Sequence, residues 1–262
     1  MKRIIGLGFL AALTMTYNIA FGADTCTKIV STGHPQYPTI AFKQGDNIVG
    51  AAPTLVEAIA KGLQIPLESR FMGTWADAQA AVRDGKADMI VGIYFNDERA
   101  QYLDYVQPAF IFDPVVAFVA KDKKFAYKGQ DDLIGKKGAT NQGESYGTEF
   151  DAFIKDKLTV ARTDGIDDAF NDLVSDKVDY VIAGYYPGTA EAARMGLKDK
   201  VEALDPGLLS AEMFVAFSKK SPCAFLAPKF GEGVTAMTTD GRFHQMLTDA
   251  IAKWDADQKP KE

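Results

Sequence analysis

The chain has 262 residues, of which 47% are hydrophobic and 24% are charged, and its formal net charge is −6 at pH 7. This acidic balance argues against a protein whose main partner is nucleic acid, because phosphate binding needs a surplus of lysine and arginine. The apolar content predicts a large folded core, and the chain is long enough for one big domain or two smaller ones.

The first residues have the layout of a secretory signal peptide. Met1, Lys2 and Arg3 precede the apolar run IIGLGFLAAL, and small residues follow, so we expect cleavage after Gly22. The apolar run is too short to cross a bilayer of about 30 Å, and no later stretch of the sequence is long and apolar enough. The mature chain has 27 basic and 35 acidic residues, and we expect it in the periplasm.

Two cysteines, Cys26 and Cys223, lie toward opposite ends of the mature chain. An even number in an exported protein favours a disulfide, and two unpaired buried thiols are the alternative. The two histidines, His34 and His244, are far apart, and neither cysteine has a partner at zinc-ligand spacing. We predict no metal site and no cofactor.

Strand-like and helix-like segments then alternate along the chain. The first set has strands at 27–32, 66–72 and 88–93, with helices at 53–64 and 75–84. The second set has a helix from about 145, a strand near 158, a helix at 166–176, a strand at 178–183 and a helix from Pro187. An amphipathic helix over 240–254 follows. This alternation predicts an α/β fold with buried, mainly parallel strands.

The two sets are related by a weak internal repeat. A shift of 91 residues superimposes 77–95 on 168–186 with five identities in nineteen positions. Each segment ends in an aromatic pair, Tyr94 with Phe95 and Tyr185 with Tyr186, just past a strand, where open α/β sheets bind ligands. The repeat predicts two similar lobes that face each other across a cleft lined with rings.

Four stretches carry a resemblance to a known family. They are YPTIAF, GAAPTLVEAIAKGLQIPLE, WADAQAAVRDGKADMIVGIYFNDERAQYLDYVQPAF and DLIGKKGATNQGES. Together they resemble the bacterial extracellular solute-binding proteins of the polar amino-acid class, which are receptors of ATP-driven (ABC) importers. The most specific part is Trp75 ten residues before Gly85, followed by Glu98 with Arg99 and then Asp104 with Tyr105.

The resemblance implies a two-lobed periplasmic binding protein fold of type II. Each lobe would be a mixed, mainly parallel sheet flanked by helices, and two crossover strands near 112–116 and 208–213 would join the lobes. We expect the following division of the chain: a signal peptide at 1–22, lobe 1 at 23–112 and 209–254, lobe 2 at 113–208, and a flexible charged tail at 255–262.

The resemblance also implies a function. A monomeric receptor would capture a small carboxylate-bearing solute, an amino acid or a related organic acid, by hinge closure, and would deliver it to the membrane permease of an ABC importer. Two other functions remain open. Some proteins of this fold present the ligand to a membrane sensor, and others are cyclohexadienyl dehydratases, although the stretch IAGYYPG (182–188) offers no carboxylate for that chemistry.

Arg99 is the strongest single candidate for ligand binding. In the resembled family an arginine at this position forks onto the ligand's α-carboxylate, since a guanidinium offers paired donors and keeps its charge at every accessible pH. The alternative is a solvated arginine that pairs with Asp97 or Glu98.

Ser145 lies between Gly143 and Gly147 in the spacing G-x-S-x-G, which is typical of a nucleophilic serine on a strained turn. The preceding residues are mostly polar, however, and the only later histidine, His244, falls in an amphipathic helix. We therefore predict no catalytic residue. The resemblance instead implies that Ser145 and nearby backbone amides at a helix start reach the ligand carboxylate, and simple helix capping is the alternative.

Other pocket residues follow from the same resemblance. Tyr37 and Trp75 align with positions that stack on or flank the ligand, and core packing is the alternative for each. Together with Tyr94 and Tyr185, they would suit a carboxylate with an apolar, aromatic or hydroxylated body. Glu144 could supply a negative charge to an amine, and a solvent-facing glutamate at a helix start is the alternative.

Three positions depart from the family pattern. Gly92 and Tyr94 stand where serine or threonine is usual, and Gly184 stands where an aspartate usually holds the ligand's ammonium group. From these losses we expect that a carboxylate is required for binding and that an α-amino group is not.

Overall fold

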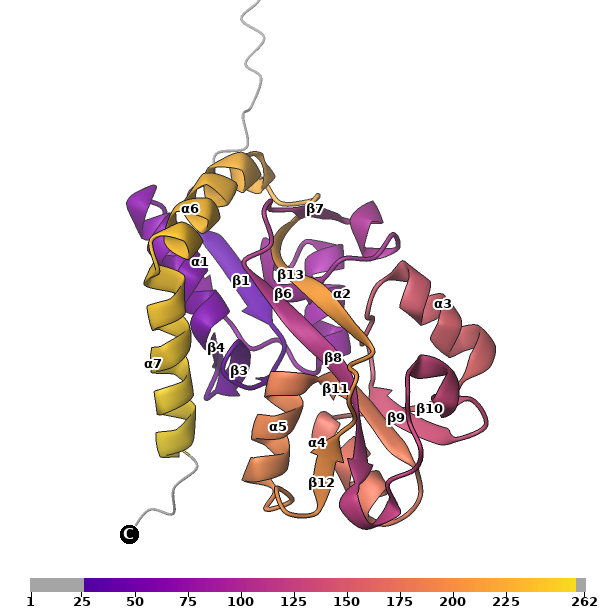
Figure 1. Cartoon of the computed structure of the whole chain (residues 1–262). Coiled ribbons are helices and arrows are strands. Elements are labelled where there is room, and N and C mark those ends of the chain that lie inside the picture. The colour runs from indigo at the N-terminus through magenta and orange to yellow at the C-terminus, as the bar shows by residue number, and fades with distance from the viewer. Residues whose placement is uncertain (1–25, 258–262) are drawn as a thin grey trace, which may run out of the picture.

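Residues 26–257 are described by a computed structural model, and the expected signal peptide lies outside this range (Figure 1). Within it, ten strands form one sheet in the order β10-β9-β11-β8-β13-β6-β1-β5, with β12 paired to β8 and β7 paired to β13. The two long central strands, β8 (Ile111–Ala120) and β13 (Leu209–Ser218), run antiparallel to each other. They are the two crossovers that the sequence predicts.

One half of the sheet belongs to the predicted lobe 1. Its strands β5 (Leu67–Ser69) and β6 (Met89–Tyr94) pair parallel with β1 (Ile29–Gly33), and β7 (Leu103–Tyr105) pairs antiparallel with β13. Its helices are α1 (Ala51–Gly62), α2 (Trp75–Asp84), α6 (Ala227–Thr239) and α7 (Arg242–Asp257). The returning helices α6 and α7 pack against α1 (Figure 1).

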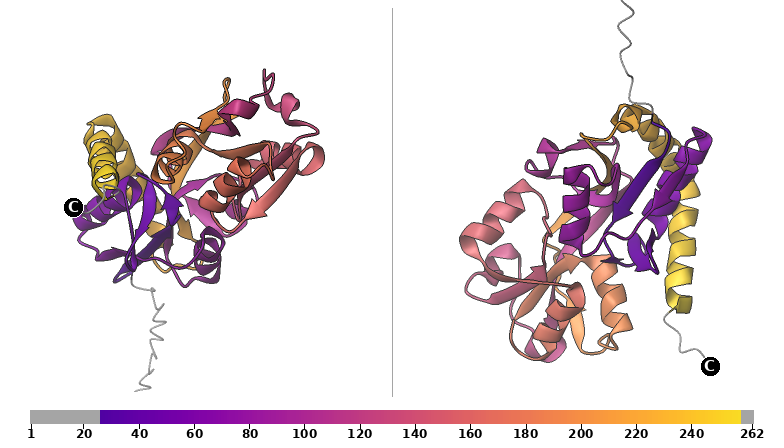
Figure 2. Two further views of the ribbon diagram at one scale, coloured as in Figure 1. Left: turned by 90° about the horizontal axis from the view of Figure 1, so that it is seen from below. Right: turned by 180° about the vertical axis from the view of Figure 1, so that it is seen from behind.

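The other half belongs to the predicted lobe 2. Its strands β10 (Thr159–Thr163) and β11 (Tyr180–Gly184) pair parallel with β9 (Lys137–Asn141), and β12 (Val201–Ala203) pairs antiparallel with β8. Its helices are α3 (Thr148–Lys157), α4 (Ile166–Val174) and α5 (Tyr185–Arg194). Figure 2 shows the two halves from below and from behind.

Local sequence explains the best-predicted element, helix α2. The Thr74 hydroxyl accepts from the Asp77 amide, and the Asp77 carboxylate accepts from the Thr74 amide, so the two residues form a capping box at the start. Gly85 ends the helix in the left-handed region at φ 78°. The predicted range 75–84 is therefore confirmed.

Some boundaries differ from those expected. Helix α3 begins at Thr148, not near 145, and α5 begins at Tyr185, two residues before Pro187. Helix α7 continues to Asp257, so the first three residues of the expected tail are helical. The sequence analysis did not anticipate the small three-stranded sheet of β2 (Gln36–Tyr37), β3 (Ala41–Gln44) and β4 (Asn47–Val49), because its strands are only two to four residues long.

The predicted disulfide is confirmed. Cys26 and Cys223 are bonded, with 197 residues between them in sequence and 4.8 Å between their Cα atoms. Cys26 precedes β1, and Cys223 precedes the short helix η4 (Ala224–Leu226) that leads into α6. The bond therefore ties the start of lobe 1 to its returning part. None of the described helices combines the length and apolarity that a membrane span needs.

Candidate ligand-binding site

The two halves of the molecule meet around two neighbouring hollows. A small enclosed cavity of about 20 Å³ is lined by His34, Gln36, Tyr37, Asn141, Glu144, Tyr146, Ile166, Ala183, Gly184, Pro187 and Gly188. A wider groove of about 500 Å³ is lined by Ala76, Gln79, Arg83, Asn96, Glu98, Arg99, Tyr102, Gln142, Gly143, Glu144, Ser145, Asp151, Lys155 and Arg162. Glu144 borders both, so the hollows form one interlobe region.

Arg99 lies at the groove edge, and only 3% of it is exposed. Its Nε donates to Gln79 Oε1 at 3.0 Å, one terminal nitrogen donates to the Tyr94 carbonyl at 3.0 Å, and the other donates to the Gly143 carbonyl at 2.9 Å. The Gly143 contact joins the two lobes. A guanidinium has five N–H groups, so one on each terminal nitrogen makes no hydrogen bond to a described residue.

Ser145 is brought close to Arg99 but is already fully engaged. Its hydroxyl donates to the Asp151 carboxylate and accepts from Asn96 Nδ2 at 2.6 Å. Because α3 starts only at Thr148 and has Gly147 as its N-cap, Ser145 does not cap that helix. The serine instead fastens the loop of lobe 2 to Asn96 of lobe 1.

The centre of the interlobe region is a buried cluster of two tyrosines and one aspartate. Tyr37 and Tyr94, from lobe 1, both donate to Oδ2 of Asp113 on β8, with the Tyr94 bond at 2.6 Å. Asp113 is 3% exposed, and its other oxygen, Oδ1, has no donor among residues 26–257. Burial raises the pKa of Asp113 to about 6, against the lowering effect of the two hydroxyl donors.

This cluster explains the glycine at position 184. A side chain on Gly184 would clash with the Tyr37 hydroxyl and with Asp113 Oδ2. The space that a residue at 184 would fill is therefore taken by the tyrosine and the carboxylate. Tyr94 and Gly184 both accommodate Asp113, Tyr94 by a hydrogen bond and Gly184 by its lack of a side chain.

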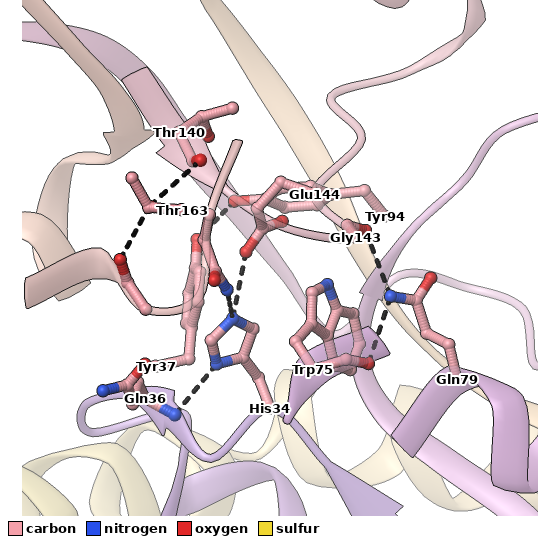
Figure 3. Close-up of polar contacts among 12 residues, drawn as sticks. His34, Gln36, Tyr37, Trp75, Gln79, Tyr94, Thr140, Gly143, Glu144 and Thr163 are labelled. Atoms are coloured by element: carbon pink, nitrogen blue, oxygen red, sulfur yellow. Dashed lines mark hydrogen bonds and ion pairs between the residues drawn. The ribbon is translucent and has the colours of Figure 1, made fainter. Parts of the chain in front are cut away.

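His34 and Glu144 form a third contact between the lobes (Figure 3). Glu144 Oε1 lies 3.0 Å from His34 Nε2, and the side chains are 9% and 3% exposed. The Gln36 amide donates to His34 Nδ1 at 2.9 Å, and Asn141 Nδ2 lies 2.9 Å from Nε2. The Glu144 side chain is thus held against His34 rather than facing solvent.

Trp75 completes this wall of the region. Its ring lies 4.9 Å from the His34 ring, and the Arg99 guanidinium carbon lies 5.7 Å from the Trp75 ring centre. The Trp75 Nε1 proton is buried and has no acceptor among the described residues. Figure 3 shows Tyr37, His34 and Trp75 on one side, with Glu144 opposite them.

Comparison with known proteins identifies the family. A family model described as bacterial extracellular solute-binding proteins, family 3, matches residues 29–254. The chain belongs to this family. The resemblance drawn from the sequence motifs is thereby confirmed.

Individual relatives of this solute-binding protein agree with that assignment. The amino-acid-binding protein AabA of Dichelobacter nodosus is 31% identical over 140 residues, which is 53% of this chain and 54% of that protein. The match thus spans about half the length of this curated relative.

Solved structures share the fold. A histidine kinase sensor domain with similarity to periplasmic binding proteins has a TM-score of 0.71 at 24% identity, covering 87% of this chain and 95% of that chain. The substrate-binding protein AbpA of an amino acid ABC transporter from Streptococcus pneumoniae, bound to L-arginine, has a TM-score of 0.70 at 22% identity, covering 87% and 96%. The two-lobed type is therefore established for this solute-binding protein.

Two of the predicted site residues lie apart from the rest. Gly92 is the extra residue of a bulge in β6, where the register with β13 shifts, and its φ of 74° favours glycine. An added Cβ there would face Ile40 and Met213, not either hollow. Tyr185 is 40% exposed and borders a different surface hollow, next to Phe118 and Lys121. The other predicted residues, Tyr37, Trp75, Tyr94, Arg99, Glu144 and Ser145, gather between the lobes.

The sequence analysis missed Asp113 and left His34 without a role. Asp113 falls inside a strand-like run, FDPVVAFVA, and only its pairing across the sheet brings it beside Gly184. No group of three or more potential metal-ligating side chains occurs in the part of the chain that the structure describes.

Proposed function

We propose that this solute-binding protein captures a small carboxylate-bearing solute between its lobes in the periplasm and delivers it, as a monomer, to the membrane permease of an ABC importer. The main support is the convergence of Arg99, Ser145, Glu144, Tyr37 and Trp75 at the contact between the two halves of the sheet. These residues come from distant parts of the chain, and a cleft between two lobes is the usual place for a small-molecule site.

Arg99 is the proposed carboxylate partner. Its two N–H groups that make no hydrogen bond to described residues lie on its two terminal nitrogens, which is the arrangement that forks onto a carboxylate. Its other three donors hold it in a fixed position, so little side-chain entropy remains to be lost on binding. Arg99 thus offers a pre-oriented positive charge at the groove.

The test is a thermal-shift screen of wild-type protein and Arg99→Ala with the twenty standard L-amino acids and their deaminated acids. A ligand at about 100 times its dissociation constant should stabilise the wild-type protein by about 2.7 kcal/mol. Arg99→Ala should lose this shift. Arg242→Ala, which changes a half-exposed arginine at the start of α7 and outside both hollows, is the matched control and should keep it. If no carboxylate shifts the wild-type protein, the proposal fails.

Hinge closure is the expected motion. The contacts of Arg99 with Gly143, Asn96 with Ser145, and His34 with Glu144 all run between the lobes, and they would separate on opening. A ligand that touches both lobes favours the closed arrangement. Small-angle scattering should show a smaller radius of gyration with saturating ligand, and an unchanged radius would contradict closure.

A sensor role is the second candidate, favoured by the fold shared with a histidine kinase sensor domain. The same cleft would serve both functions, because each needs a closed, liganded form. Crosslinking of the liganded protein in membranes of its source bacterium distinguishes them. Recovery of a permease supports import, and recovery of a receptor kinase supports sensing.

Binding without turnover is part of the proposal, and the relatives are binding proteins. One observation keeps the dehydratase alternative testable: IAGYYPG has no carboxylate, but Asp113 lies beside Gly184 and has a raised pKa. Such an acid can protonate a leaving group. Incubation with prephenate should give no phenylpyruvate, and its formation would replace this part of the proposal.

A further inference from the structure

The polar atoms of the Asp113 cluster are unevenly satisfied. Oδ2 of Asp113 accepts from two hydroxyl groups, while Oδ1 is buried without a donor among residues 26–257. A buried carboxylate oxygen without a donor is expensive, and native proteins rarely retain one unless something else pairs with it. The unpaired atom therefore points to a ligand group that can donate.

The missing side chain at Gly184 places this carboxylate next to the cavity. Gly184 and Tyr37 both line the enclosed cavity. The Tyr37 hydroxyl donates to Asp113, and a Cβ added at Gly184 would meet Asp113 Oδ2. With no side chain at 184, Asp113 lies directly behind these two lining residues. The ring centroids of its two donors, Tyr37 and Tyr94, are 6.5 Å apart, and the Tyr146 ring lies 6.2 Å from that of Tyr94.

A second buried carboxylate, Glu144, borders the same cavity from the other lobe. Its only ion-pair partner among the described residues is His34, whose Nδ1 already accepts a hydrogen bond from the Gln36 amide. The two carboxylates are close enough that the negative charge of Glu144 disfavours ionisation of Asp113. They form an acidic pair walled by aromatic rings.

No side-chain cation of the described residues neutralises this pair. Arg99 gives its hydrogen bonds to two carbonyl groups and an amide oxygen. Arg162 donates to the backbone carbonyl of Glu144 at 2.8 Å and not to its carboxylate. The interlobe region thus holds two buried acids and one buried arginine, which leaves a positive charge to be supplied by the ligand.

We propose that Asp113 is the specificity-determining residue of the cleft and binds a cationic nitrogen of the ligand, a primary ammonium or a guanidinium, with Glu144 as the second acceptor. This inference rests on the proposed function, in which Arg99 holds a carboxylate of the same molecule. The ligand class is then an amino acid or another zwitterion, and not a simple organic acid. The carboxylate would then come from the crossover strand β8 and not from the end of β11, where this chain has Gly184.

A purely structural Asp113 is the competing explanation, and Asp113→Asn separates the two. The asparagine can still accept both tyrosine hydroxyls through Oδ1, so the hydrogen bonds of the cluster persist while the charge is removed. A structural role predicts no change in ligand preference. Removing one partner of a buried charge pair in a binding site typically weakens binding by about 30-fold or more.

The experiment is calorimetric titration with matched probes. Each L-amino acid that stabilises the wild-type protein is titrated beside its deaminated acid, into wild type, Asp113→Asn and the control Glu212→Gln, an exposed acid on the neighbouring crossover strand. In the wild type and in Glu212→Gln the amino acid should bind at least about 30-fold more tightly than its deaminated acid. In Asp113→Asn that preference should shrink to less than about 10-fold, and the amino acid should bind more weakly.

The outcomes separate this inference from the proposed function. Equal binding of amino acid and deaminated acid to the wild type overturns the inference and leaves carboxylate capture standing. A preference for the amine that persists in Asp113→Asn moves the role to another residue and overturns the assignment of Asp113. If no amino acid or deaminated acid binds, ligand released from purified protein is identified by mass spectrometry. A released compound that carries no basic nitrogen, or the absence of any released compound, then overturns the inference as well.

If Asp113→Asn does not fold, the wild-type comparison and Glu144→Gln still decide. Glu144 is the second acceptor, so Glu144→Gln should also narrow the preference for the amine, by a smaller factor than Asp113→Asn. An unchanged preference in Glu144→Gln would remove it from the proposed pair.

Discussion

The edge and the centre of the interlobe contact differ in how completely their polar atoms are hydrogen-bonded. At the groove edge, Arg99, Gln79, Asn96 and Ser145 donate and accept in a connected set that joins Gly143 to lobe 1. At the centre, three buried atoms lack partners among residues 26–257, namely Asp113 Oδ1, Trp75 Nε1 and Asn141 Oδ1. A satisfied set can hold two lobes together by itself, whereas an unsatisfied one favours a further group.

The difference also explains how one cleft can close on many solutes and still discriminate between them by charge. Edge contacts between the lobes depend little on the ligand, so they stabilise closure for many solutes. Central contacts become favourable only when a ligand of the right charge arrives, and they set the preference. The predictions below test this division, from the largest expected effect to the smallest.

The largest effect is expected from the disulfide, which lies outside both regions. In the chain-entropy model a bond across 197 residues contributes up to about 5 kcal/mol. The double variant Cys26→Ser with Cys223→Ser should lower the free energy of unfolding by several kcal/mol in denaturant titrations. Its preference among ligands should stay that of the wild type. A changed preference would show that stability and selectivity are not separable here.

Asp113→Asn should stabilise the protein in the absence of ligand. The raised pKa of about 6 means that ionising Asp113 is harder in the folded than in the unfolded chain. Its contribution is therefore fully present below about pH 4 and is lost as the pH rises through about 6. The loss above that pH is about 3 kcal/mol, from a shift of about two units. Urea unfolding at pH 4 to 8 should show this slope in the wild type and not in the variant, and parallel profiles would contradict it.

Gly184→Ala tests how tightly Tyr37 and Asp113 pack against Gly184. The new Cβ would clash with the Tyr37 hydroxyl and Asp113, so a loss of about 2 kcal/mol is expected. Gly129→Ala is the control, because an added Cβ there meets nothing within 4 Å. Thermal melting of both variants measures the difference. Equal melting temperatures would mean that Tyr37 and Asp113 can move aside to accept the added methyl group.

The smallest effect concerns the edge. A double-mutant cycle tests the 2.6 Å hydrogen bond between Asn96 and Ser145. It compares Asn96→Ala, Ser145→Ala and the double variant with the wild type. A coupling energy of about 1 kcal/mol is expected in unfolding experiments. When ligand binding is measured for the same variants, their preference for an amino acid over its deaminated acid should change little. A large change would place part of the selectivity at the edge.

Several features of the fold were readable from sequence, because they follow from local patterns. Helix α2 is defined by Thr74 and Gly85, and the strands at 89–94 and 180–184 are apolar runs. The start of α5 was misplaced, since Pro187 is acceptable at several positions of a first turn. Short strands such as β4 depend on pairing partners that a single segment does not reveal.

The site was only partly predictable for the same reason. Arg99 and Glu144 belong to motifs with fixed spacing, but Asp113 looks like one acid in a strand-like run. Asp113 pairs with Ala211 of β13, and the antiparallel pairing of β8 with β11 brings Gly184 beside it, so its surroundings come from residues far apart in the chain. The sequence shows that position 184 lacks a carboxylate, and only the packing shows that Tyr37 and Asp113 fill the space beside Gly184.

The bond between Cys26 and Cys223 also affects how the chain behaves when it is cut or pulled. Almost the whole described chain lies between the two cysteines, so a protease that cleaves one loop anywhere in that interval leaves two pieces still covalently joined. A stretching force applied to the two ends would extend only the segments outside the bond, chiefly α6 and α7. Lobe 2 and the part of lobe 1 between the two cysteines would stay mechanically shielded until a reductant opened the disulfide.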